Sequence, residues 1–171
     1  PQSLPEGIDC RRCHGPGDAH ASSGGKAPVL NPAKLDRQRN LEVCMQCHLE
    51  TTSFPLPHAV NRFGRGVFSY SPAEPLVAYA IHFDHAAAAG RTGKFDIVNA
   101  VYRLRQSACF RKSEMTCTAC HNPHQSGSKG DAACKSCHAS PPGAVHANAR
   151  DCASCHMPKR RPSDAIHVTM T

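Results

Sequence analysis

Five short segments of the chain share the pattern Cys-x-x-Cys-His, and they begin at Cys10, Cys44, Cys117, Cys134 and Cys152. The two thiols of such a segment can add across the two vinyl groups of one porphyrin, and the following imidazole can bind the iron. One copy is weak evidence, because Cys-x-x-Cys also serves redox pairs and zinc sites. Five copies that all end in His predict five covalently attached haem c groups.

Each motif supplies two attachment cysteines and one proximal iron ligand. The predicted attachment residues are Cys10, Cys13, Cys44, Cys47, Cys117, Cys120, Cys134, Cys137, Cys152 and Cys155. The predicted proximal ligands are His14, His48, His121, His138 and His156. We expect each motif to occupy one or two helical turns, so that its first Cys and its His face one porphyrin.

The cysteine count supports haem over zinc. The chain has 11 cysteines, and the motifs leave only Cys109. A zinc ribbon takes two Cys pairs per metal, and five pairs cannot be divided evenly among such sites. Cys109 has two interpretations: a buried, small apolar thiol on a helix, or a thiol that forms an inter-chain disulfide or binds an extra metal.

Histidine is abundant enough to supply the second axial ligands. Of the 12 histidines, seven lie outside the proximal positions: His20, His58, His82, His85, His124, His146 and His167. Five six-coordinate haems need five of them, so we expect haems with two His ligands and low potentials. Met115 and Met170 are alternative sixth ligands, which would raise the potential.

Sequence spacing gives some of these histidines expected roles. His20 follows the first motif across a Gly-Pro-Gly turn, and His124 is three residues after His121, so each should serve a haem other than its own. His146 lies between the last two motifs, and His167 follows the last. The alternative for each of these histidines is a side chain that donates a hydrogen bond to a haem propionate or that lies in solvent.

The remaining candidates lie in the middle of the chain. His58 follows a stiff Pro-Leu-Pro loop. His82 and His85 are three residues apart and would share one helix face, with one as ligand and the other paired with Asp84 or a propionate.

Composition predicts a thin core. Aromatic residues make up 5%, Trp is absent, and there are 14 Pro and 12 Gly. Such a chain buries little apolar surface by itself. We therefore expect a mainly α fold with extensive loops, a small multihaem cytochrome c fold organised around packed haems, whose apoprotein is largely unfolded.

Two helices are predicted between the motif clusters. Ser71-Pro72-Ala73-Glu74 has the form of a capping box and predicts a helix that ends at Gly90. Apolar residues at helical spacing predict a second helix over 94–110, with one face listed as Phe95, Val98, Val101, Leu104 and Ala108. Residues 15–32 are rich in Gly, Pro, Ala and Ser and predict a loop.

The motifs divide the sequence unevenly. We expect a single multihaem domain over 1–171, with a dihaem segment at 1–48, a helical spacer at 49–116 and a trihaem segment at 117–171. The formal charge is +7, which we assign to neutralising haem propionates or to docking an acidic redox partner, and not to nucleic acid. No apolar run reaches the roughly 18 residues of a transmembrane segment.

The motifs carry a family resemblance. Cys-His-Gly-Pro-Gly-x-x-His at 13–20 and Cys-His-x-Pro-His at 120–124 resemble the tetrahaem cytochrome family linked to hydroxylamine oxidoreductase. A bacterial branch of that family, often joined to tetratricopeptide repeats, is similar to residues 43–57, 65–75, 82–109 and 151–168. The resemblance implies electron transfer through closely packed haems. In that branch a further haem-bearing segment usually precedes this part, so we expect a processed fragment or a shorter relative.

Three functions compete at this stage. The leading hypothesis is a carrier or conduit that passes electrons to redox protein partners and is not an enzyme. The alternative is an oxidoreductase that acts on a small nitrogen or sulfur compound at one five-coordinate haem. The third is a self-associating filament subunit. Covalent haem attachment takes place outside the cytoplasm, so we expect an exported protein in the periplasm, at the cell surface or in the extracellular space.

Overall fold

The computed structural model describes residues 7–49, 57–84, 93, 100–143, 146, 150–163, 165–167 and 169. The chain forms two compact units. Unit 1 comprises Pro1–His85 and Asp96–Glu114, and unit 2 comprises Ala86–Phe95 and Met115–Thr171. The assignment of the whole chain to a single multihaem domain stays a prediction.

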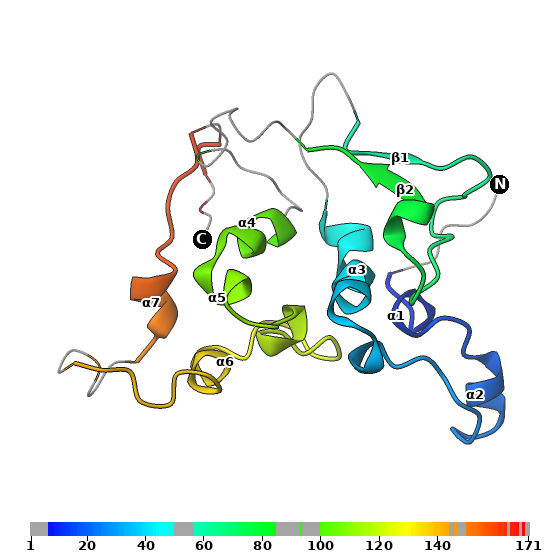
Figure 1. Ribbon diagram of the computed structural model, residues 1–171, viewed down its shortest axis with the longest axis horizontal. Helices are drawn as coiled ribbons and strands as arrows, with labels where there is room; N and C mark the ends of the chain where they lie inside the picture. The colour runs from blue at the N-terminus through cyan, green and yellow to red at the C-terminus, as the bar shows by residue number, and fades with distance from the viewer. Residues whose placement is uncertain are drawn as a thin grey trace. The chain divides into compact units, whose positions relative to one another are not determined.

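Short helices joined by loops make up most of the structure (Figure 1). Unit 1 contains α1 (Arg11–His14), α2 (Asp18–Ser22), η1 (Pro32–Lys34), α3 (Arg37–His48), β1 (Ala59–Asn61), η2 (Leu76–Ala78), β2 (Ala80–His82), α4 (Ala100–Gln106) and α5 (Ala108–Arg111). Unit 2 contains η4 (Cys117–Ala119), α6 (Asp131–Lys135) and α7 (Cys152–His156). The predicted class, mainly α with extensive loops, is confirmed.

The helix α3 organises unit 1. Its N-cap, Asp36, accepts a hydrogen bond from the Arg39 amide at 3.0 Å. The helix buries Leu41, Val43 and Met45 and contacts η1, η2 and α4. The second Cys-x-x-Cys-His motif therefore forms the last turn of a helix that is anchored in a core.

The helix predicted to follow the Ser71 capping box, through Leu76 to Ala89, is wrong over its described residues. Only the single 3₁₀ turn η2 forms there, and the chain then enters β2, which pairs antiparallel with β1. Pro75 is extended, with ψ of 128°, and Ala73 has a φ of +80°. The Glu74 carboxylate accepts a hydrogen bond from the Tyr79 hydroxyl at 2.6 Å. Long-range strand pairing thus overrides the local capping signal, and residues 85–90 lie outside the described part.

The second predicted helix is partly confirmed. Helix α4 covers Ala100–Gln106 and buries Val101, while residues 94–99 lie outside the described part. A break follows, because the Ser107 side chain accepts a hydrogen bond from the Phe110 amide and starts the separate helix α5. Ala108 is consequently exposed. Cys109 is exposed as well, so its interpretation as a buried thiol is wrong.

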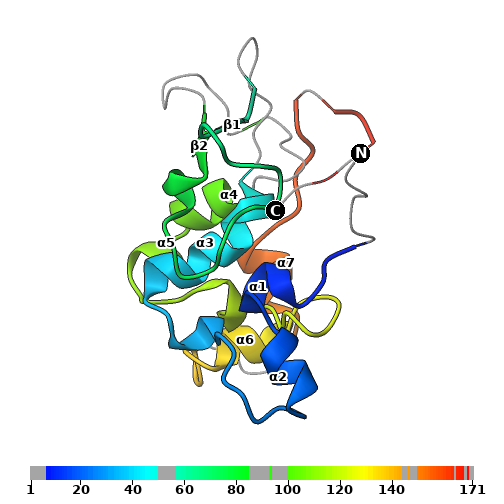
Figure 2. The ribbon, with the colours of Figure 1, turned by 90° about the vertical axis from the view of Figure 1, so that its right-hand side faces the viewer.

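The loop prediction for residues 15–32 is also wrong in part, because α2 forms within it. This short helix lies after α1 in unit 1, and the two appear close together in both ribbon views (Figure 1, Figure 2). In the described part of the chain, no helix is long and apolar enough to cross a membrane.

Unit 2 has little protein core. Among its described residues only Pro162 is buried. Helices α6 and α7 contact each other, and both carry Cys-x-x-Cys-His cysteines. The sequence of unit 2 therefore builds motif-bearing turns with few apolar side chains packed between them.

Candidate functional site

All five motifs lie on helical turns, as the sequence predicts. In three of them the His amide donates to the carbonyl of the first Cys: His14 to Cys10 at 2.9 Å, His121 to Cys117 at 3.0 Å and His138 to Cys134 at 2.9 Å. The other two motifs lie in α3 and α7. Residues four apart share one face of a helix, so the first Cys and the His of each motif lie on the same side.

Two of the motif histidines have Nδ1 at a backbone carbonyl. The Nδ1 atom of His14 lies 2.7 Å from the Leu30 carbonyl, and that of His121 lies 3.3 Å from the Gly127 carbonyl. A carbonyl can only accept, so Nδ1 donates and Nε2 keeps its lone pair. Metal-ligating histidines in proteins usually donate their second nitrogen in this way.

The first two motifs meet in unit 1. The Gln46 side chain, in the second motif, donates to the Arg12 carbonyl, in the first, at 2.9 Å. Burial raises the pKa of the Cys13 thiol, and the neighbouring Cys47 and Cys10 raise it further. Cysteines from two different motifs therefore lie close together.

The last two motifs meet in unit 2 through a carboxylate. Asp131, at the start of α6, accepts the amide of Cys152 at 2.8 Å and the amide of Asp151 at 2.8 Å. Hydrogen bonding from Cys152 lowers the pKa of Asp131. A hydrogen bond with Asp131 in turn raises the pKa of Cys152, and the nearby Cys134 contributes. Asp131 thus fixes α7 to α6 and brings thiols of the fourth and fifth motifs together.

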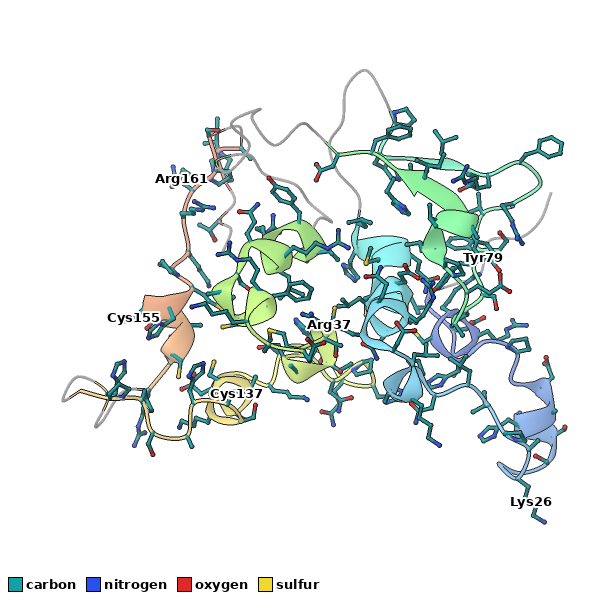
Figure 3. The ribbon with its side chains drawn as sticks, viewed as in Figure 1. Lys26, Arg37, Tyr79, Cys137, Cys155 and Arg161 are labelled. Carbon is teal, nitrogen blue, oxygen red and sulfur yellow. The ribbon has the colours of Figure 1, made fainter. Side chains whose placement is uncertain are left out.

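Sequence reasoning did not find this carboxylate clamp. Its only local signal is an acidic residue in the first turn of α6, a position that any helix favours. The partner amides lie 20 and 21 residues away, and Asp151 has a φ of +61°. Figure 3 labels Cys137 beside α6 and Cys155 on α7, one cysteine from each of the two motifs that this contact joins.

The third motif is closed by a hairpin-like return of the chain. The Lys129 amide donates to the Cys120 carbonyl at 2.8 Å, and its ammonium donates to the Thr118 carbonyl at 2.7 Å. An isolated bridge pairs His121 with Ser128. The motif is therefore held locally, within about a dozen residues of its own His.

Two candidate distal histidines have the same orientation as His14. The Nδ1 atom of His20 lies 2.6 Å from the Ala27 carbonyl, and that of His146 lies 2.5 Å from the Pro142 carbonyl. Each ring therefore keeps Nε2 for another partner. The His146 ring lies beside the ring of His156, the histidine of the fifth motif, with centroids 6.1 Å apart.

The other candidates are placed differently. His58 directly precedes β1, and its carbonyl accepts the Phe83 amide at 2.9 Å, while His82 is the last residue of β2 and pairs with Ala59. His82 belongs to a strand, so the shared helix face predicted for it and His85 is wrong, and His85 itself lies outside the described residues. His124 and His167 are both exposed.

The donor set fits haem better than a bare metal ion. No group of three or more His, Cys, Asp or Glu side chains that could hold a metal ion occurs among the described residues. A haem iron needs only two ligands from the protein, because the porphyrin supplies four nitrogens. The separated His and paired, accessible thiols of these motifs match that requirement.

A buried phenol gives a second test of fit. Tyr70 packs edge-on against Tyr79, with centroids 5.4 Å apart, and its buried hydroxyl has no hydrogen-bond partner within the described residues. Figure 3 labels Tyr79 in this region. Burial raises the pKa of Tyr70, the Glu42 carboxylate raises it further, and Cys44 is also close. A protonated donor beside the second motif suits an acceptor such as a haem propionate.

Comparison with known proteins points the same way. The chain is 26% identical to multiheme cytochrome MtrA of Shewanella baltica (strain OS185) over 173 residues, which cover 96% of this chain and 47% of MtrA. The chain is similar to a multihaem cytochrome. It spans about half the length of that curated relative. No family model matches the chain, and no solved structure matches it. The resemblance to cytochromes linked to hydroxylamine oxidoreductase stays a prediction.

Proposed function

We propose that this chain is an electron-transfer protein that carries five covalently bound haem c groups and has no catalytic haem. The observation that carries the proposal is that motif cysteines meet in pairs: the Gln46 hydrogen bond joins the motifs of Cys13 and Cys47, and the Asp131 hydrogen bond joins those of Cys134 and Cys152. Haems attached at such cysteines would lie close to each other. The likeness to a multihaem cytochrome over nearly the whole chain supports the same function.

The cysteines and histidines of the chain would have different roles at the haems. The ten motif cysteines hold the haems by thioether bonds, and the five motif histidines bind the irons from one side. The second axial ligands come from the remaining histidines, so that most haems have two His ligands. When bound, the haems supply one-electron redox chemistry. The chain sets their spacing through bonds such as those from Asp131 and Gln46.

Two-His coordination distinguishes a conduit from an enzyme. We propose that every iron is low-spin and closed to small ligands. Adding carbon monoxide to the dithionite-reduced protein tests this, because carbon monoxide binds rapidly only to an open iron. No rapid binding is expected. Rapid binding to one haem in five would favour an oxidoreductase that acts on a small nitrogen or sulfur compound.

The role of His124 can be tested in the same way. Its position three residues after His121 keeps its ring on or near the proximal side of its own haem, so we propose that it ligates a different one. Replacing His124 with Ala should make a neighbouring haem high-spin while His121 still holds its own. An unchanged low-spin spectrum would contradict the assignment.

Location, partners and assembly are the finer parts of the proposal. We place the protein outside the cytoplasm, where haem is attached, and give it redox proteins as partners. A histidine not used within the chain, such as His20 or His167, would complete a haem in a second copy and favour self-association into a filament. Light scattering at low micromolar concentration tests this, and a monomer with every haem six-coordinate would refute it.

A further inference from the structure

We infer that His146 and His156 are the two axial ligands of one iron, that of the haem attached at Cys152 and Cys155. The inference rests on the proposed function, because it needs a haem at the fifth motif. It goes further by pairing a particular distal histidine with a particular haem. All four residues belong to unit 2.

The spacing of the two rings is that of a trans imidazole pair. Their centroids lie 6.1 Å apart and their planes are inclined by 20°. Metal–imidazole bonds are about 2.0–2.1 Å, so two imidazoles on opposite sides of one metal have centroids roughly 6 Å apart. The centroid distance therefore matches that of two axial imidazoles, and near-parallel planes are an allowed arrangement for such a pair.

His146 is also prepared chemically for this role. Its Nδ1 donates to the Pro142 carbonyl at 2.5 Å, which leaves the lone pair on Nε2. The His146 amide donates to the Gly143 carbonyl at 3.0 Å, so the same turn holds both the backbone and the ring. Gly143 has a φ of +97°, which an L residue rarely adopts. The Pro142–Gly143 turn therefore fixes both the ring and its tautomer without the haem.

His156 belongs to the helix that carries the attachment cysteines. It is the last residue of α7, the helix that also carries Cys152 and Cys155, and the Asp131 clamp holds the start of that helix. The six-residue step from His146 to Cys152 can span up to about 20 Å when extended. That is ample for the chain to pass from one face of a porphyrin to the other, so no other segment has to move.

Within unit 2 the number of candidate distal histidines equals the number of motifs. Three motifs lie in this unit, and three of the candidate distal histidines lie there with them: His124, His146 and His167. His124 follows its own proximal ligand too closely to serve that haem. The ring of His146 contacts the ring of His156, the histidine of the fifth motif.

Replacing His146 with Gly in the fully matured protein tests the pairing. One haem in five should become high-spin in the ferric absorption and electron paramagnetic resonance spectra, and added imidazole should restore the low-spin form. The low-spin signal that disappears in this variant should be the rhombic signal that near-parallel axial imidazoles give in the wild-type protein. Replacing the exposed Ser140 with Ala, in the same connecting segment, is the matched control and should leave all five haems low-spin.

Five low-spin haems in the His146→Gly protein, with intact mass confirming five attached haems, would overturn the pairing and leave the proposed function standing. A wild-type protein without five low-spin haems would instead refute the proposed function. If the Gly variant loses a haem during maturation, His146→Met decides. One low-spin haem of raised potential supports the pairing, and five unchanged potentials overturn it.

Discussion

The two units build their motif sites by different means. In unit 1 the second motif ends a 12-residue helix with a buried face, and Leu41 and Val101 are each only 3% exposed. In unit 2 the motifs lie on turns of three to five residues, and only Pro162 is buried among the described residues. Unit 1 can hold its motifs by packing. Unit 2 needs its cofactors, because so small a buried surface does not offset the entropy of ordering a chain.

The side chains that join neighbouring motifs also differ between the two units. In unit 1 a neutral side chain, Gln46, joins the two motifs, and the core packs behind it. In unit 2 an ionised carboxylate, Asp131, joins α6 to α7 at exposed or half-buried positions. The comparison implies that unit 1 is fixed by its interior and that unit 2 is fixed by a few polar bonds and by covalent haem.

Removing the haems should produce the largest difference between the two units in protection against hydrogen exchange. When the chain is made without haem attachment, we expect unit 2 to lose all protection against amide hydrogen exchange, because Pro162 is the only buried residue among those that the structure describes there. Helices α3 and α4 of unit 1 should retain measurable protection. Hydrogen exchange read by mass spectrometry checks both, and equal protection in the two units would break the comparison.

Deleting a core side chain should affect unit 1 nearly as strongly. Leu41→Ala should lower the free energy of unfolding of unit 1 by about 2–5 kcal/mol, because it leaves a cavity in a packed interior. Guanidinium titration monitored through hydrogen exchange of α3 measures this. Val67→Ala is the control, since Val67 is 70% exposed, and it should cost less than about 0.5 kcal/mol. A cost of that small size for Leu41→Ala would show that unit 1 also depends on haem alone.

The buried Glu42 should give unit 1 a characteristic pH dependence. Burial alone would raise the pKa of Glu42, but hydrogen bonds from Gln38, Arg39 and the Leu76 amide outweigh it and lower the pKa. A lowered pKa contributes stability that is complete above the unfolded value, about 4.3, and is lost as the pH falls through the folded value.

Glu42→Gln should therefore destabilise unit 1 at pH 7 by about 1–3 kcal/mol and flatten its loss of stability in acid. The control is Glu114→Gln, because the Glu114 side chain is 89% exposed in its ion pair with Arg37. Denaturant midpoints between pH 7 and pH 3 measure both variants. Parallel pH curves for the wild-type and Glu42→Gln proteins would contradict the assignment.

Removing the clamp should loosen unit 2 alone. Asp131→Ala takes away the acceptor for the Asp151 and Cys152 amides, so both amides should exchange faster. Magnetic coupling between the haems of the fourth and fifth motifs should weaken. Asp18→Ala is the matched control, because Asp18 is likewise the first residue of a five-residue helix, in unit 1. Unchanged exchange at Asp151 and Cys152 would show that haem alone holds α7 to α6.

The smallest expected effect concerns Cys109. It is exposed on α5 and outside every motif, so the native holoprotein should bind one equivalent of an alkylating reagent. Cys109→Ser should abolish that reaction and change stability by less than about 0.5 kcal/mol. Further reactive thiols would mean that some motif cysteines carry no haem.

Features set by neighbouring residues could be predicted from the sequence. The motif turns form as expected, because each needs only the contacts of five consecutive residues. The failures lie where distant residues decide. The capping box at Ser71 loses to a hydrogen bond from the Leu76 amide to Glu42 at 3.1 Å and to strand pairing with residues 59–61. Ser107 ends α4 early, and Cys109 is exposed as a result.

The candidate site shows the same limit. The motif residues could be predicted as haem-binding from the sequence because their chemistry is local, and that assignment stays a prediction. Distal partners could not be predicted, because a count of histidines says nothing about which rings meet. The contact between the His146 and His156 rings depends on the turn at Gly143, and the hydrogen bond from the Cys152 amide to Asp131 depends on the turn at Asp151. Both residues have a positive φ, which could not be predicted from the sequence.

The most direct test of the central claim is the intact mass of the mature protein under denaturing conditions. Only covalently bound groups survive that measurement. We predict the mass of the polypeptide plus five haems, one for each Cys-x-x-Cys-His motif. A mass with four haems or fewer would contradict the account.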